Sequence, residues 1–209
     1  MAHNLAALLR LMLVTDDAVV GGRDLVALVQ AAERGGVTSV QLRLKAASPR
    51  ALAEAARALI GAVRIPVLVN DRPDVALAAG AAGVHLGPDD LPVPLARRIA
   101  PPGFLIGASA GTAEEAADAV GADYWGVGPW RATTTKLDAG AALGAEGFAR
   151  VVRLAGETPC VAVGAVRPED VSEIRRAGGA GVAVISGILA AADIERAARA
   201  YAAALERAE

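Results

Sequence analysis

The chain of 209 residues is 54% hydrophobic, carries a formal net charge of −2 and contains only 3% aromatic residues. This length and apolar content suffice to bury the core of one domain, residues 1–209, without disulfides or metals for stability. A near-neutral charge and few aromatic rings supply neither the basic field nor the stacking surfaces typical of nucleic-acid binding. We therefore expect no nucleic-acid partner.

The N-terminal segment LAALLRLMLV is apolar, but Arg10 interrupts it and the preceding MAHN carries no lysine or arginine. A secretory signal has a basic flank, so we predict instead a short helical extension that leads into the first strand. No segment approaches the roughly 18 uninterrupted apolar residues of a membrane span, so we expect no membrane partner. The single cysteine, Cys160, is expected to be a buried small hydrophobe, and the protein is expected to be cytoplasmic.

Apolar runs rich in valine and isoleucine predict eight β-strands, at 11–15, 39–44, 66–70, 83–86, 104–109, 124–128, 159–164 and 181–186. Alanine-rich segments with helical spacing lie between these runs, and several exit through glycine. Strands that are apolar throughout are buried on both faces, as in a parallel sheet covered by helices. We therefore predict an α/β fold, a single (β/α)8 TIM barrel, with an open doubly wound sheet as the alternative.

The rarest polar residues lie beside predicted strand ends. Of the 21 basic residues only two are lysines, Lys45 and Lys136, and Gln41 and Asn70 are comparably rare amides. An ammonium and a guanidinium differ at a compact anion site, so the scarcity of lysine indicates that these two serve chemistry. The carboxyl ends of barrel strands form one catalytic mouth, where we expect these side chains to meet.

The second predicted strand delivers Gln41, Arg43 and Lys45 with one parity, and its two cations indicate a grip on phosphate or carboxylate. Asp71 follows the third strand, and Asp90 lies in the loop after the fourth. Magnesium favours one or two carboxylates together with waters and phosphate oxygens, so this pair predicts a Mg2+ site.

Alternatively, Asp89 or Asp90 caps a helix that opens near Pro92, a structural role that we assign to Asp89 in particular.

The later strands indicate a second anion site. Strand 104–109 ends at Ser109, and strand 124–128 leads into three threonines that precede Lys136. Strands 159–164 and 181–186 end in small residues that let backbone N–H groups approach a ligand, and the loops after the last two barrel strands often bind phosphate. Two anion sites at one mouth suggest two phosphorylated substrates.

Six segments, taken in order, resemble the thiamine phosphate synthase family of (β/α)8 barrels: VQLRLK, VLVND, GVHLGPDDL, IGAS, GADYWGVGPWRATTTK and GVAVISGI. The resemblance runs through nearly the whole chain, and six motifs in register are highly specific. It implies a transferase that couples 4-amino-2-methyl-5-(diphosphooxymethyl)pyrimidine to a (carboxy)thiazole phosphate, releases pyrophosphate and uses Mg2+.

The resemblance also implies a role for each candidate residue. The diphosphate would be held by Gln41, Arg43, Lys45, Asn70 and Lys136. Magnesium would be bound by Asp71 and Asp90, and Ser109 would face the pyrimidine. The thiazole phosphate would be held by Thr133, Thr135 and the backbone around Gly164, Ala165, Ser186 and Gly187. Catalysis would rest on Arg43, Lys45, Ser109 and Lys136.

The chain departs from the family pattern at Pro88, Leu137, Ala165 and the segment Ser109–Thr112. Pro88 removes an amide beside the expected metal loop. Ala165 stands where the family has its second glycine. If this position needs a positive φ, alanine strains the loop or weakens thiazole binding.

Three other functions fit the sequence less well. A thiazole tautomerase-type paralogue needs a histidine just after strand 124–128, and neither His3 nor His85 fits; we expect His85 to be a hydrogen-bonded strand residue. A non-catalytic phosphate-ligand barrel would not need both the aspartate pair and both lysines. A Schiff-base aldolase needs a lysine in apolar surroundings. The expected partners are small-molecule substrates, and the oligomeric state, a homo-oligomer included, stays open.

Overall fold

Eight parallel strands form a closed barrel in the computed structural model, which describes residues 4–132 and 140–208. The strands are β1 (Leu11–Val14), β2 (Ser39–Leu42), β3 (Val67–Asn70), β4 (Gly83–Leu86), β5 (Leu105–Ser109), β6 (Tyr124–Val127), β7 (Cys160–Val163) and β8 (Gly181–Val184). Each strand pairs with the next, and β8 closes the ring on β1 through the pairs Leu11–Val182 and Leu13–Val184. The predicted (β/α)8 barrel is confirmed, and the open-sheet alternative is wrong.

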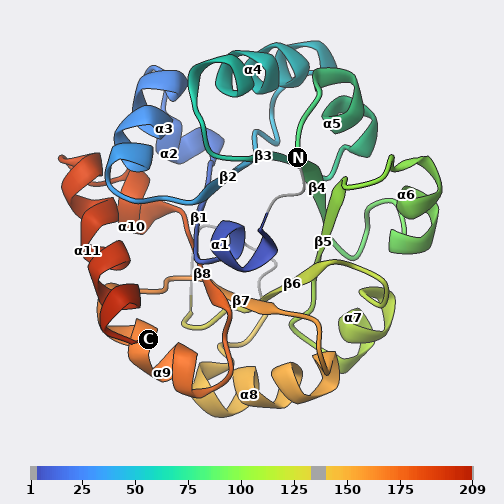
Figure 1. Ribbon diagram of the computed structural model, residues 1–209, viewed down its shortest axis with the longest axis vertical. Helices are drawn as coiled ribbons and strands as arrows, with labels where there is room; N and C mark the ends of the chain where they lie inside the picture. Colours follow the sequence, from blue (N-terminus) through green and yellow to red (C-terminus); the bar gives the residue numbers. More distant parts are fainter. Residues whose placement is uncertain (1–3, 133–139, 209) are drawn as a thin grey trace.

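Helices surround the barrel as an outer ring (Figure 1). They are α2 (Asp17–Val20), α3 (Leu25–Arg34), α4 (Pro49–Ala62), α5 (Pro73–Ala79), α6 (Val93–Ile99), α7 (Ala113–Asp118), α8 (Gly144–Ala155), the 3-10 turn η1 (Pro168–Asp170), α9 (Val171–Arg176), α10 (Ser186–Leu189) and α11 (Ile194–Arg207). Helix α4 shows how the sequence pattern forms such a helix. In α4, Ser48 caps the first turn and Pro49 opens the helix, while Leu52, Ala56 and Leu59 form the buried face.

The predicted N-terminal helix is α1 (Leu5–Leu9), which lies at the centre of the ring in Figure 1 rather than in the ring itself. It covers the end of the barrel where the strands begin. The carbonyl of Leu8 accepts hydrogen bonds from Thr38 and Ser39 at the start of β2, and Leu8 and Leu9 are buried. At the opposite end, where the strands finish, the described residues line a cavity.

The barrel interior is filled by apolar side chains together with one buried tyrosine. Met12, Val14, Leu68 and Val161 pack there around Tyr124. Tyr124 fits because the neighbouring strand has a glycine at position 107, where an added Cβ would lie 2.1 Å from the tyrosine ring.

Between barrel and helices, Cys160 is buried, and this burial raises the pKa of its thiol to about 11, as expected of a small core residue. Among the helices of the described residues, none is both long and apolar enough to cross a membrane.

All eight predicted strands are present, but several end one or two residues early. The run predicted for 39–44 ends at Leu42, because the Thr15 hydroxyl takes over the pairing of Arg43. It accepts the Arg43 N–H at 2.8 Å and donates to the Arg43 carbonyl at 3.1 Å. Gly164 likewise leaves the extended conformation, with φ 95°, just after β7. Arg43 and Gly164, which line the mouth, therefore lie just beyond the paired strand residues.

Candidate active site

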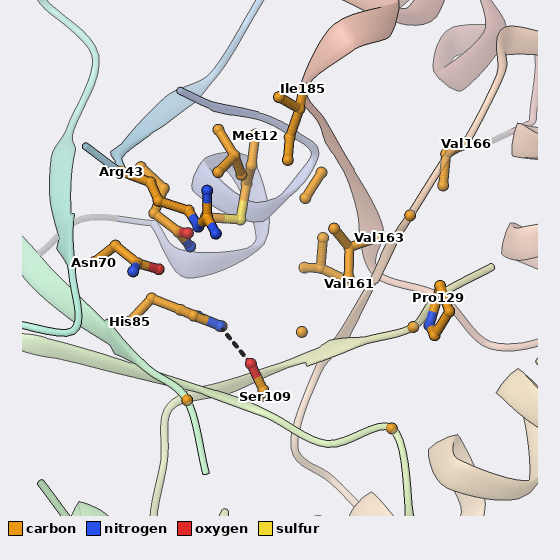
Figure 2. Close-up of a pocket in the computed structure, with 18 of the residues that line it drawn as sticks. Met12, Arg43, Asn70, His85, Ser109, Pro129, Val161, Val163, Val166 and Ile185 are labelled. Atoms are coloured by element: carbon orange, nitrogen blue, oxygen red, sulfur yellow. Dashed lines mark hydrogen bonds between the residues drawn. The ribbon is translucent and has the colours of Figure 1, made fainter. Parts of the chain in front are cut away.

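A cavity of about 780 Å3 opens at the carboxyl ends of the strands. Its lining includes every described residue that the sequence predicted for a site: Gln41, Arg43, Lys45, Asn70, Asp71, Asp90, Ser109, Gly164, Ala165, Ser186 and Gly187. Figure 2 shows Arg43, Asn70 and His85 on one side of the cavity and Val163 and Val166 on the other. Predicted site residues Thr133, Thr135 and Lys136 lie outside the described part of the chain. The two sides of the cavity therefore carry different side chains and can receive different parts of a ligand.

One cation and two carboxylates meet at the ends of β2, β3 and β4. The Lys45 Nζ lies 2.5 Å from the Asp71 Oδ2. Asp71 adopts a left-handed φ of 64° and donates its N–H to the His85 carbonyl at 2.8 Å, which fixes its direction. Asp90 accepts the Gly87 N–H at 2.6 Å through Oδ2.

Asp90 also faces Asp71. Partial burial, together with the hydrogen bond to Asp71, raises the pKa of Asp90 to about 6. A divalent ion bound by both carboxylates would relieve their mutual repulsion.

This pair fits magnesium. Asp71 and Asp90 supply two carboxylates, and among the described residues no group of three or more histidine, cysteine or acidic side chains could hold a metal. Magnesium commonly takes one or two carboxylates and completes its octahedron with water and substrate phosphate oxygens.

The alternative role for Asp89, as a helix cap, is wrong. Helix α6 is preceded by Pro92 and has no side-chain capping bond, and Asp89 is exposed.

Two acidic residues that sequence reasoning missed contact Arg43 and Lys45, which follow β2. Asp16 is buried and binds Arg43, with its Oδ2 2.8 Å from the Arg43 Nη1. The other oxygen of Asp16 accepts the N–H groups of Ala18 and Val19 and so caps α2. Asp17 accepts the backbone N–H of Lys45 at 2.7 Å. Their position could have identified them, because Asp16 and Asp17 directly follow the first predicted strand and so lie at the mouth of the barrel.

A buried polar chain forms part of the cavity wall. The His85 Nδ1 lies 3.0 Å from the Tyr124 hydroxyl, and its Nε2 lies 3.2 Å from the Ser109 Oγ, the contact drawn dashed in Figure 2. His85 is thus the hydrogen-bonded strand residue that was expected. Burial raises the pKa of Tyr124 well above its ordinary value, so its phenol stays protonated. Sequence reasoning did not link His85 or Tyr124 to Ser109.

Small residues shape the cavity beside β7 and β8. A Cβ on Gly164 would lie 2.6 Å from the Pro129 Cβ, and one on Gly187 would lie 2.2 Å from the Tyr201 hydroxyl. That hydroxyl donates to the Val166 carbonyl at 2.9 Å and so supports the wall. Ala165 has a φ of 48°, in the left-handed region that disfavours alanine. The condition set for strain at this position, a positive φ, is therefore met.

A closed (β/α)8 barrel whose mouth joins cations, paired carboxylates and small-residue loops defines a class, that of barrel enzymes acting on phosphorylated substrates. Residues 11–188 match the family model described as thiamine monophosphate synthase. A thiamine-phosphate synthase from Azorhizobium caulinodans is 50% identical over 196 residues, which cover 91% of this chain and 92% of the relative. Another, from Xanthobacter autotrophicus, is 49% identical over 202 residues, 94% of this chain and 95% of the relative.

The solved structure of thiamine phosphate pyrophosphorylase from Pyrococcus furiosus superposes with a TM-score of 0.87 at 36% identity, covering 98% of this chain and 99% of that one. The chain belongs to the thiamine monophosphate synthase family. This confirms the expectation drawn from the six motifs, a thiamine-phosphate synthase that acts as a transferase in thiamine biosynthesis.

Proposed function

We propose that the protein couples 4-amino-2-methyl-5-(diphosphooxymethyl)pyrimidine to a thiazole phosphate and forms thiamine phosphate and pyrophosphate, with Mg2+ as cofactor. The observation that carries this proposal is the division of one cavity. Its β2–β4 side gathers Arg43, Lys45 and the facing carboxylates, and its β7–β8 side is formed by small residues. A volume of about 780 Å3 is in the range of pockets that enclose whole small-molecule ligands.

The diphosphate belongs on the side of β2–β4. Arg43 and Lys45 neutralise charge that develops on the leaving group as its bond to the pyrimidine methylene breaks. Asn70 and Gln41 donate amide N–H groups to the same substrate, and Lys136 adds a second ammonium. Magnesium, held by Asp71 and Asp90, would supply further positive charge to the diphosphate oxygens.

Bond changes in this reaction balance without an added reagent. The carbon–oxygen bond between the methylene and the diphosphate breaks, and its electron pair leaves with pyrophosphate. The thiazole nitrogen lone pair then forms the new carbon–nitrogen bond, and no proton has to move. The residues therefore need to stabilise charge and to orient rings rather than to act as a strong base.

The pyrimidine is proposed to lie against Ser109, whose hydroxyl is oriented by His85. The thiazole phosphate is proposed to bind at the other side of the cavity, at Gly164, Ala165, Ser186 and Gly187, with Thr133 and Thr135. Lys45 is half exposed and paired with Asp71, whereas a Schiff-base lysine needs apolar surroundings, which disfavours that role here. We expect residues 1–209 to act as one domain in this reaction.

The test is an assay of the purified protein with both substrates and magnesium. Thiamine phosphate and pyrophosphate should appear in equal amounts, and omission of thiazole phosphate should abolish the first product. Absence of thiamine phosphate under the complete conditions would refute the proposal.

A further inference from the structure

Asp170 is a buried carboxylate at the end of η1 that no step of the proposed reaction uses. Its side chain is 3% exposed. It receives both prongs of the Arg131 guanidinium, with the Nε 3.0 Å from Oδ2, and the backbone N–H of Arg167 at 2.9 Å. Burial opposes its ionisation, but hydrogen bonds from Arg131, Arg167 and the Trp130 side chain outweigh burial and lower the pKa of Asp170. Asp170 is therefore a charged anchor rather than a solvated surface group.

The anchor joins two loops of the mouth. Trp130 and Arg131 follow β6, whereas Arg167 and Asp170 follow β7. Backbone bonds reinforce the connection, because the Trp130 N–H donates to the Val163 carbonyl at 2.7 Å and the Arg131 N–H donates to the Gly164 carbonyl at 3.0 Å. We call the interaction of Asp170 with Arg131 the Asp170 clamp.

Between these attachment points lies a strained turn. Gly164 and Ala165 have φ angles of 95° and 48°, and a left-handed conformation costs an alanine roughly 1–2 kcal/mol. Such a conformation persists only where several surrounding contacts hold the backbone in it. The clamp supplies that constraint, since it fixes the turn from both ends, through Gly164 on one side and Arg167 on the other.

The turn faces the cavity. Gly164, Ala165 and Arg167 line it, and within the described residues the backbone N–H of Ala165 has no hydrogen-bond acceptor. A backbone N–H of a left-handed turn that lines a cavity can donate a hydrogen bond to a bound oxyanion. If the turn is already rigid, it loses little conformational entropy when a phosphate binds, and the phosphate therefore binds more tightly.

We propose that Asp170 and Arg131 are positioning residues for the second substrate: their clamp holds the Gly164–Arg167 turn in the conformation that binds the phosphate of that substrate. Neither side chain touches a reacting atom. The inference rests on the proposed function, because it assigns the thiazole phosphate to this side of the cavity.

The first test replaces Asp170 by asparagine, which keeps the shape and removes the charge. D170N should raise the KM for thiazole phosphate about tenfold, while the KM for the pyrimidine diphosphate and kcat at saturation change less than twofold. R131Q should raise the same KM. It should destabilise the fold less than D170N does, because the Arg131 side chain is half exposed. The double variant should lose little more than the worse single variant, since both changes break one interaction.

Asp123 offers a matched control at the opposite end of the barrel. It binds Arg97 at 2.8 Å and accepts the Ile106 N–H at 2.7 Å, so it is also an Arg–Asp clamp that accepts a backbone N–H. D123N should lower the melting temperature and leave both KM values unchanged. An equal rise of both KM values in D170N and R131Q, or kinetics like those of D123N, would overturn the positioning role.

Calorimetric titration with thiazole phosphate alone separates this inference from the proposed function. Suppose that turnover fails, but wild-type protein binds thiazole phosphate and both clamp variants bind it about tenfold more weakly. That result would refute the proposed reaction and support the positioning role of Asp170 and Arg131. If wild-type protein and the clamp variants bind it equally, or wild-type protein does not bind it, the clamp proposal is wrong.

Discussion

The Lys45 ammonium lies 2.5 Å from the Asp71 carboxylate, so the rare lysine after β2 is tied directly to the acidic residue that follows β3. A compact point charge fits between Asp71 and an incoming phosphate, whereas a planar guanidinium needs more room and a two-pronged partner. K45R should therefore lower kcat/KM for the diphosphate substrate about tenfold or more, as measured by steady-state kinetics. Arg57 is exposed on α4, and R57K should leave the kinetics unchanged. Wild-type kinetics in K45R would mean that the diphosphate grip depends on Arg43 and the metal.

The two neighbouring acids, Asp71 and Asp89, should respond very differently to loss of charge. Asp71 contacts Lys45 and faces Asp90, whereas Asp89 is exposed and caps no helix. D71N should reduce kcat/KM by roughly a hundredfold or more, because it weakens the charge cluster that neutralises the leaving group. D89N should change it less than about twofold. Similar losses in the two variants would show that the metal carboxylates were misassigned.

Asp90 should make the stability of the metal-free protein depend on pH. Its pKa is raised to about 6 from an ordinary value of 3.8, so the folded protein binds this proton more tightly than the unfolded chain does. The stabilising contribution is complete below the ordinary pKa and is lost as the pH rises through 6. Thermal melts of the metal-free protein should show this loss in wild type and not in D90N.

The same carboxylate predicts the effect of magnesium. At pH 7.5 in the absence of metal, D90N should melt higher than wild type, because the repulsion between Asp90 and Asp71 is removed. Added magnesium should raise the melting temperature of wild type more than that of D90N. Equal shifts in both proteins would place the ion elsewhere.

Ala165 should be a source of strain that glycine relieves. Because φ is 48° there, A165G is expected to raise the free energy of unfolding by about 1 kcal/mol in denaturant titrations. Ala58 is an exposed position inside α4, and A58G should instead lower the free energy of unfolding by about 1 kcal/mol. A destabilised A165G would show that the turn tolerates alanine without strain.

The fold could be predicted from the sequence because its strands and helices carry strong local patterns. Continuous apolar runs with glycine exits give the eight strands, and rare residues such as Lys45 and Asn70 mark their carboxyl ends. The second strand was predicted to be two residues too long. The hydroxyl of Thr15, which follows β1, takes the backbone hydrogen bonds of Arg43 in place of a paired strand. Such a replacement depends on the register of β1 with β2, which no local pattern encodes.

Contacts between distant residues were harder to predict. The Asp16–Arg43 pair joins residues 27 apart in the chain, and Asp170 and Arg131 are 39 apart. Both aspartates look like ordinary loop or helix-start acids in the sequence. Only the closed ring of strands brings their loops together, so their roles depend on tertiary structure.

Two anions should bind at opposite sides of one mouth, and a crystal structure of the protein with magnesium, pyrophosphate and thiazole phosphate would show where each lies. Pyrophosphate should contact Arg43 and Lys45 beside an ion held by Asp71 and Asp90, with the second phosphate at Gly164 and Ala165. Pyrophosphate bound away from Lys45 and Asp71, or both anions bound at one side of the cavity, would contradict this arrangement.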